Sequence, residues 1–140
     1  MDIKTGVKEL ETLIKNMEPI LNKGEYVFAT VSNIESIPRS MTICEMKEKE
    51  GITIVLTKQD AEDLDLSFNF IASWITLNIH SSLDAVGLTA AFSTALGNQN
   101  ISCNVIAGYY HDHIFVDKKD EEKAMNVLIE LSKSTHSNSL

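Results

Sequence analysis

Polar residues with chemically useful side chains gather at the start of a predicted helix. They are His80, Ser81, Ser82 and Asp84, and Gly87 follows them. A helix start presents backbone N–H groups that have no partner within the helix, which favours binding of an anion such as a carboxylate. Asp84 could accept hydrogen bonds from an ammonium group, and Gly87 would let a ligand approach the backbone closely. This segment therefore predicts a site for a small molecule that carries both a carboxylate and an ammonium group, such as an amino acid.

A neighbouring strand could complete this site, and a purely structural explanation also stays open. Asn104 lies on the next predicted strand, and its amide could bond either end of the ligand. On the other explanation, Ser81 and Asp84 only form a capping box, and Gly87 only relieves a close contact between the helix and the sheet. The residue pattern by itself does not decide between the two.

Histidines supply an alternative chemistry in the same region. His80 ends one predicted strand, and His111-Asp112-His113 lies in a turn between two later strands. A right-handed crossover would bring these segments to the same end of a sheet, and strand alternation puts His80 and His113 on one face. The alternative metal set is His80, His111 and His113, which could also perform acid–base chemistry or make an amino-acid site sensitive to pH. A hydrogen-bonded turn is the more common explanation of such a tripeptide.

Sequence patterns typical of several other protein classes are absent. The chain has no nucleophile elbow, phosphate-binding glycine-rich loop, dinucleotide fingerprint or Cys-x-x-Cys pair, so we expect neither catalysis nor a cofactor. A net charge of −8 argues against nucleic acid as a partner. No apolar run approaches the ~20 residues of a membrane helix, and the first residues lack a secretory signal, so we expect a cytoplasmic protein without a membrane partner. Cys44 and Cys103 are interpreted as buried reduced thiols.

Hydrophobic periodicity indicates the elements that would position the site in the second part of the chain. Tyr109 and Tyr110 are expected to pack on a sheet. The apolar stripe of the last helix contains Ala124, Val127, Leu128 and Leu131. The predicted elements are strands over 74–80, 101–110 and 114–116, a helix that follows Ser81 and ends at Gly97-Asn98, and a last helix capped by Asp117.

The first part of the chain has a different order of predicted elements. An amphipathic helix is expected to run from Val7 to Leu21, with Pro19 kinking its last turn. The segment 22–24 would then end this helix. The remaining predictions are a strand over 26–31, a loop over 32–40, a hairpin of strands 41–46 and 52–56, and a short helix over 58–64 that begins with a capping-box-like Thr57 and Asp60.

Together these elements predict an α+β fold. The order strand, helix, strand, strand, helix fits a ferredoxin-like sandwich, in which a split βαβ motif builds an antiparallel sheet with helices on one face. The final strand of such a sandwich is missing, and the N-terminal half could supply it. The opposite sheet face would carry Trp74, Thr76, Asn78, Ile106 and Phe115, and an uncovered face of this kind often pairs with a second copy, so we expect a homodimer.

Four segments of the chain resemble ACT-like domains, and in particular a small bacterial family of stand-alone tandem ACT-like proteins. The two main segments are 79–91 and 101–113, and Tyr26-Val27-Phe28 and 50–54 are also similar to that family. The resemblance implies two ACT-like halves, 1–67 and 68–140. The first half departs from the usual ACT order, because its long helix precedes its first strand, and this departure does not support a second, equivalent ligand site.

The resemblance also implies a function. ACT domains typically bind amino acids and regulate enzymes, and no catalytic residues come with the resemblance. We therefore expect a non-catalytic regulatory protein that binds a small amino acid or a related metabolite and acts on a regulated enzyme partner. A module that only binds a partner, without a ligand, is the remaining alternative. The implied ligand-binding residues are His80, Ser81, Ser82, Leu83, Asp84, Val86, Gly87, Asn104 and Ile106.

Overall fold

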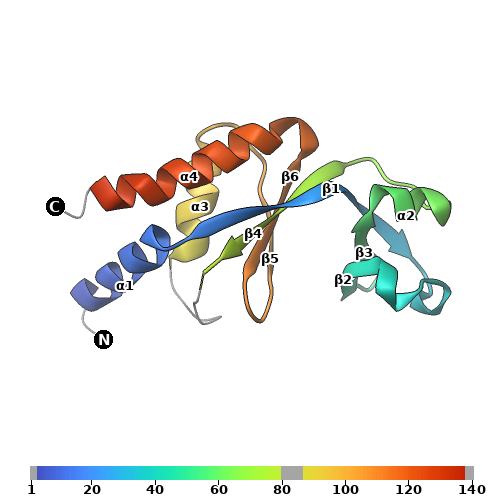
Figure 1. Ribbon diagram of the computed structural model, residues 1–140. Helices are drawn as coiled ribbons and strands as arrows, with labels where there is room; N and C mark the ends of the chain where they lie inside the picture. Colours follow the sequence, from blue (N-terminus) through green and yellow to red (C-terminus); the bar gives the residue numbers. More distant parts are fainter. Residues whose placement is uncertain (1–2, 80–86, 138–140) are drawn as a thin grey trace. The chain divides into compact units, whose positions relative to one another are not determined.

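The computed structural model describes residues 3–79 and 87–137 (Figure 1), with side chains at 9–79 and 87–133. The chain divides into two compact units, one formed by 1–22 with 74–140 and the other by 23–73. The helices are α1 (Ile3–Lys15), α2 (Lys58–Asp63), α3 (Leu88–Gly97) and α4 (Glu121–Ser137). The strands are β1 (Glu18–Val31), β2 (Thr42–Lys47), β3 (Ile52–Thr57), β4 (Ile71–Asn78), β5 (Asn104–Ala107) and β6 (Asp112–Asp117).

The unit 23–73 is built on the predicted hairpin. β3 pairs antiparallel with β2 on one side and with β1 on the other, so the strand order is β2-β3-β1. Val27, Ile54 and Leu56 are fully buried in its core. α2 begins as predicted, because the Thr57 side chain accepts a hydrogen bond from the Asp60 amide at 3.1 Å. The sequence therefore predicted this hairpin and its helix correctly.

The unit formed by 1–22 and 74–140 has the predicted ferredoxin-like core. Its strand order is β1-β4-β6-β5, and β5 and β6 are antiparallel. Helices α1, α3 and α4 pack against one another within this unit (Figure 1). The predicted supply of the final strand by the N-terminal half is confirmed, because β1 lies next to β4. The buried core combines Ile75 and Leu77 of β4, Phe92 and Leu96 of α3, Ile114 and Val116 of β6, and Ala124 and Leu128 of α4.

The first helix is shorter than predicted. α1 ends at Lys15, and the chain is extended from Glu18 onward, whereas the apolar spacing predicted a helix to Leu21. The physical reason lies in Pro19, which has no N–H for the helix and disfavours helical geometry at the residue before it. Ile14 and Met17 are buried in the core of the unit, so the apolar stripe is real but spans the helix end.

Two boundaries in the second part of the chain also differ from prediction. β5 covers only Asn104–Ala107, because the Gly108 amide donates to the His111 carbonyl at 2.9 Å and turns the chain there. β6 extends over Asp112–Asp117 and is longer than the predicted 114–116. The predicted cap at Asp117 is confirmed, since its carboxylate accepts a hydrogen bond from the Lys119 amide at 3.0 Å.

Helix α3 begins at Leu88, later than the start after Ser81 that the sequence predicted. Gly87 precedes it with φ +93°, in the left-handed region that favours glycine. A Cβ atom built on Gly87 would lie 3.0 Å from Cδ2 of Leu10, so α1 also approaches this backbone closely. Ser81 and Asp84, the predicted capping box, lie outside the described residues. The glycine is thus required by its own backbone conformation, whatever else it does.

The two compact units do not coincide with the predicted ACT-like halves. Packing groups α1 and the first residues of β1 with 74–140, since Ile14 and Met17 belong to that core. The division into ACT-like halves at 1–67 and 68–140 stays a prediction, because the packing units do not test it.

We predict that Gly87→Ala lowers the free energy of unfolding by about 1–2 kcal/mol, because an L residue is strained at this φ. Gly97→Ala is the matched control at the other end of α3, where a new Cβ would meet nothing within 4 Å. That control should be neutral or slightly stabilising, because alanine favours helix. Urea unfolding followed by circular dichroism measures both variants.

A second substitution separates strain from crowding. In the Gly87→Ala background, Leu10→Ala removes the nearest side chain but leaves φ unchanged, so it should recover little stability. Full recovery would show that the contact with Leu10, and not the backbone conformation, requires glycine.

Candidate functional site

The predicted ligand site is bracketed by two buried residues of the core. Ile79 follows β4 and Leu88 begins α3, and both belong to the same apolar cluster. The six predicted site residues His80, Ser81, Ser82, Leu83, Asp84 and Val86 lie between them, outside the described residues, and their roles stay predictions. The core therefore fixes where this connection leaves the sheet and where it enters the helix.

The start of α3 has the backbone arrangement that a carboxylate requires. Gly87 is the N-cap and makes no side-chain capping hydrogen bond, and its carbonyl accepts the Ala91 amide at 2.9 Å as the first bond of the helix. The amides of the first helical turn have no acceptor within the helix, and the helix dipole favours negative charge there. Gly87 is the one predicted site residue at this helix start that the structure describes.

The other two described site residues lie on β5. The Asn104 side chain donates its amide N–H to the Phe115 carbonyl of β6 at 3.2 Å. Ile106 lies opposite His113 in the same strand pair. A ligand that used the Asn104 amide nitrogen would therefore compete with a hydrogen bond that joins β5 to β6.

His113 lies in a polar network that the sequence analysis did not predict. The Trp74 indole N–H donates to Nδ1 of His113 at 3.0 Å, and Thr76 Oγ1 lies 3.1 Å from the same nitrogen. The Asn22 side-chain amide donates to Thr76 Oγ1 at 2.9 Å and to the Trp74 carbonyl at 3.2 Å. A carbonyl can only accept, so the Asn22 nitrogen must face it. Strand alternation correctly placed Trp74 and Thr76 on one face. The sequence analysis assigned Asn22 to the end of the first helix and therefore did not predict its hydrogen bonds to β4.

Burial, and to a smaller extent neighbouring charges, perturbs the pKa values of His113 and Asp112. Burial lowers the pKa of His113, the nearby His111 lowers it further, and Asp112 raises it in part. Burial raises the pKa of the Asp112 carboxyl, and the charge of His113 opposes that shift. Nδ1 of His111 is buried and makes no hydrogen bond within the described part of the chain. Neutral His113 is thus favoured by its surroundings.

His111 and His113 do not form a metal site with other described residues. Within 3–79 and 87–137, no group of three or more His, Cys, Asp and Glu side chains is arranged to hold a metal ion. Nδ1 of His113 accepts a hydrogen bond from the Trp74 indole. The ring centroids of His111 and His113 are 6.5 Å apart. His80, the third member of the alternative set, lies outside the described residues, so that set stays a prediction.

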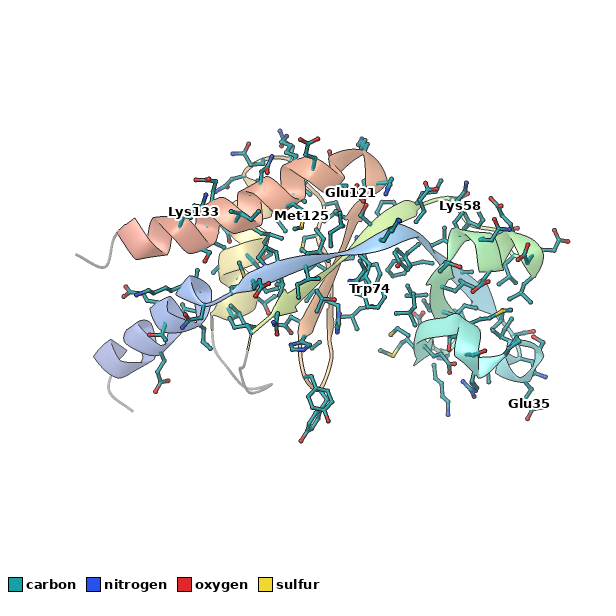
Figure 2. All side chains as sticks on the ribbon, in the orientation of Figure 1. Glu35, Lys58, Trp74, Glu121, Met125 and Lys133 are labelled. Atoms are coloured by element: carbon teal, nitrogen blue, oxygen red, sulfur yellow. The ribbon has the colours of Figure 1, made fainter. Side chains whose placement is uncertain are left out.

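The tyrosine prediction is wrong. Tyr109 and Tyr110 are 81% and 76% exposed at the turn between β5 and β6, and their rings contact each other edge to face at a centroid distance of 5.0 Å. The turn that closes between Gly108 and His111 removes both residues from the strands, so they cannot pack on the sheet. By contrast, Phe115 remains on β6, where its ring stacks on that of Trp74 at a centroid distance of 6.0 Å. Trp74 is labelled in Figure 2.

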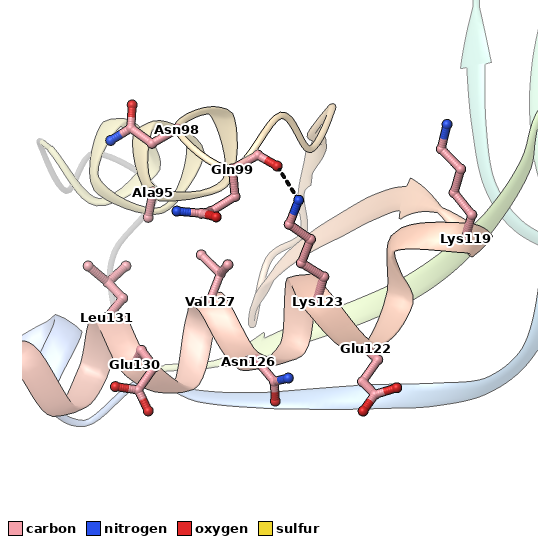
Figure 3. Close-up of a pocket in the computed structure, with 10 residues that line it drawn as sticks. All are labelled: Ala95, Asn98, Gln99, Lys119, Glu122, Lys123, Asn126, Val127, Glu130 and Leu131. Atoms are coloured by element: carbon pink, nitrogen blue, oxygen red, sulfur yellow. Dashed lines mark hydrogen bonds between the residues drawn. The ribbon is translucent and has the colours of Figure 1, made fainter.

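A separate groove of about 770 Å³ lies between α3 and α4 (Figure 3). Val127 and Leu131 point from α4 toward α3, while Glu122, Asn126 and Glu130 point away from it. Lys123 donates to the Gln99 carbonyl at 2.8 Å and closes one end of the contact. The sequence analysis identified Val127 and Leu131 only as part of the apolar stripe of α4. It did not predict the groove, because the polar residues that line it come from the residues just after α3 and from α4 with the turn before it, which share no sequence motif.

Two further findings concern the cysteine thiols and the length of the helices. Cys44 and Cys103 are free thiols, as predicted, although each is only partly buried. Burial raises the pKa of Cys103 to about 11, so this thiol stays protonated near neutral pH. Among the described residues, no helix has the length and apolar character needed to cross a membrane.

Comparisons with known proteins agree with this geometry. One ACT domain model matches residues 5–73, and a second ACT domain model matches residues 69–130. A structure from Vibrio cholerae, described as a protein of unknown function and possible transport protein, is 47% identical, with a TM-score of 0.82, and the match covers 91% of this chain and 98% of that one. Comparison with curated proteins gave no significant match.

More distant solved structures share the fold. A protein from Agrobacterium tumefaciens is 19% identical over 83% of this chain and 89% of that one, with a TM-score of 0.65. The regulatory subunit of aspartate kinase from Thermus thermophilus, in its ligand-free form, is 5% identical over 81% of this chain and 97% of that one, with a TM-score of 0.64. With the two domain matches and the Vibrio cholerae relative, these structures lead to one conclusion: the chain belongs to the ACT domain family and carries two ACT-type domains in tandem.

Proposed function

We propose that this chain is a non-catalytic regulatory protein that binds a small amino acid or a related metabolite at the connection between β4 and α3. The observation that carries the proposal is the start of α3, where the N-cap is Gly87, which has a left-handed backbone and no side chain of its own to bond the first amides. This leaves the first-turn amides suited to a ligand carboxylate. Asp84 and Asn104 are the groups we expect to bind the ligand ammonium and to orient the ligand.

The family supports the regulatory part of this proposal. ACT domains are regulatory domains, and the regulatory subunit of aspartate kinase shares this fold. The proposal includes a homodimer and a regulated enzyme partner in the cytoplasm, as the two ACT-type domains suggest, since such domains typically regulate enzymes.

We predict that one or a few amino acids raise the melting temperature of the purified protein in a thermal-shift screen. A ligand at about 100 times its Kd stabilises the native state by about 2.7 kcal/mol, which corresponds to a shift of several degrees. A parallel arm uses divalent metal ions with and without a chelator. A shift that only metals produce, and that the chelator reverses, would favour the histidine alternative, and no shift in either arm would contradict ligand binding.

We predict that Asp84→Ala abolishes the ligand-induced shift while lowering the stability of the ligand-free protein by about 1 kcal/mol at most, the cost of one lost hydrogen bond. Asp63→Ala is the matched control, since it removes an exposed carboxylate of α2 in the other compact unit. Calorimetric titration with the amino acid found in the screen measures affinity in each variant. If Asp84→Ala lowers stability but leaves affinity unchanged, Asp84 has only a structural role.

A further inference from the structure

The hydrogen bond between Trp74 and His113 determines which ring nitrogen of His113 carries a proton. The indole nitrogen of tryptophan is a donor only, so Nδ1 of His113, 3.0 Å away, must be the acceptor. In a neutral imidazole the single proton then lies on Nε2. This contact fixes both the charge and the tautomer of His113 without reference to any titration.

Protonation of His113 would affect its two partners differently. An imidazolium carries hydrogen on both ring nitrogens, so an N–H at Nδ1 would face the indole N–H at the present separation of 3.0 Å. Thr76 can adapt, because its hydroxyl oxygen has two lone pairs and can accept from both Asn22 and His113. Trp74 cannot adapt, because its nitrogen has no acceptor function. The indole contact is therefore the one that breaks.

We propose that His113 is a pH-dependent latch for Trp74. Neutral His113 holds the indole across β4 and β6, and protonation at Nδ1 releases it. The released side chain also leaves its stacked position on Phe115, where the ring centroids are now 6.0 Å apart. Acid conditions would in this way change the sheet face that carries Trp74, independently of any ligand at the start of α3.

The surroundings of His113 determine the direction of this response. Among the described residues, the titratable groups that act on it are His111 and Asp112. Its neighbours on β4 and β1 are the uncharged Trp74, Thr76 and Asn22, and the residue opposite it on β5 is Ile106. With its pKa lowered by burial, His113 takes up its proton at a lower pH in the folded chain than in the unfolded chain. The stability that the latch contributes is therefore present above the unfolded value of about 6.5 and is lost as the pH falls below it.

Trp74 is the only tryptophan in the chain, so its fluorescence reports on the latch directly. We predict that the emission of the wild-type protein changes in a single step with a midpoint below about pH 6.5, because release of the indole from His113 exposes the ring to water. The far-UV circular dichroism should stay constant through this step. A fluorescence change that occurs only together with loss of the dichroism signal would be acid unfolding and would overturn the proposal.

Two variants test the assignment to His113. His113→Asn keeps an acceptor oxygen near the position of Nδ1 but does not titrate, so the step should disappear. His111→Asn, the matched control, should keep the step and move its midpoint to higher pH, because it removes a neighbouring positive charge. A step that survives in His113→Asn would assign the response to another group.

A measurement on the wild-type protein covers the case in which His113→Asn does not fold. Nitrogen NMR of the histidine rings distinguishes a bare ring nitrogen from a protonated one. At neutral pH, Nδ1 of His113 should be bare and Nε2 protonated, and both should be protonated below the fluorescence midpoint. A proton on Nδ1 at neutral pH would contradict the latch.

Discussion

The two faces of β4 are the constraint on which the rest of its unit depends. Ile75 and Leu77 point into the helix-covered core, where both are fully buried, while Trp74 and Thr76 point to the opposite face and bond His113. Because the side-chain period of a strand is two, a register shift of one residue would exchange these sets. Such a shift would bury the hydroxyl of Thr76 among aliphatic side chains and remove the acceptor from the indole. Hydrophobic burial and polar bonding therefore specify the same register.

The beginning of the chain completes this unit in a way that local sequence patterns do not reveal. Ile14 and Met17 enter the core with α3 and α4, and Asn22 bonds Thr76 and the Trp74 carbonyl. These contacts join residues more than 50 positions apart in the sequence. Their formation requires closure of the intervening loop, which costs conformational entropy that the buried apolar area must offset.

Much of the fold could be predicted because its signals are local. Alternation identified the apolar face of β4, the capping pattern at Thr57 identified α2, and the missing final strand was correctly attributed to the N-terminal half. The errors have physical causes of a different kind. The spacing of Met17 and Leu21 continues a helical stripe that Pro19 interrupts, and a turn hydrogen bond at Gly108 withdraws two tyrosines from the sheet. At the candidate site, the structure describes Gly87, Asn104 and Ile106. Periodicity predicts which face a residue occupies but not which groups meet across strands, so it did not predict the bond from Asn104 to the Phe115 carbonyl.

β4 also connects the two chemical features of its unit. Its middle carries the contacts to His113, and its end leads to Ile79, which is anchored in the core just before the candidate ligand segment. β4 transmits displacement poorly by bending, since the side chains on its core face are close-packed, but it can transmit a change in pairing with β6. Two inputs would then act on one strand, a ligand at its end and a proton at its middle. Coupling between them requires that the β4–β6 pairing differ between the latched and released states, so its size depends on how far β4 moves when Trp74 leaves His113.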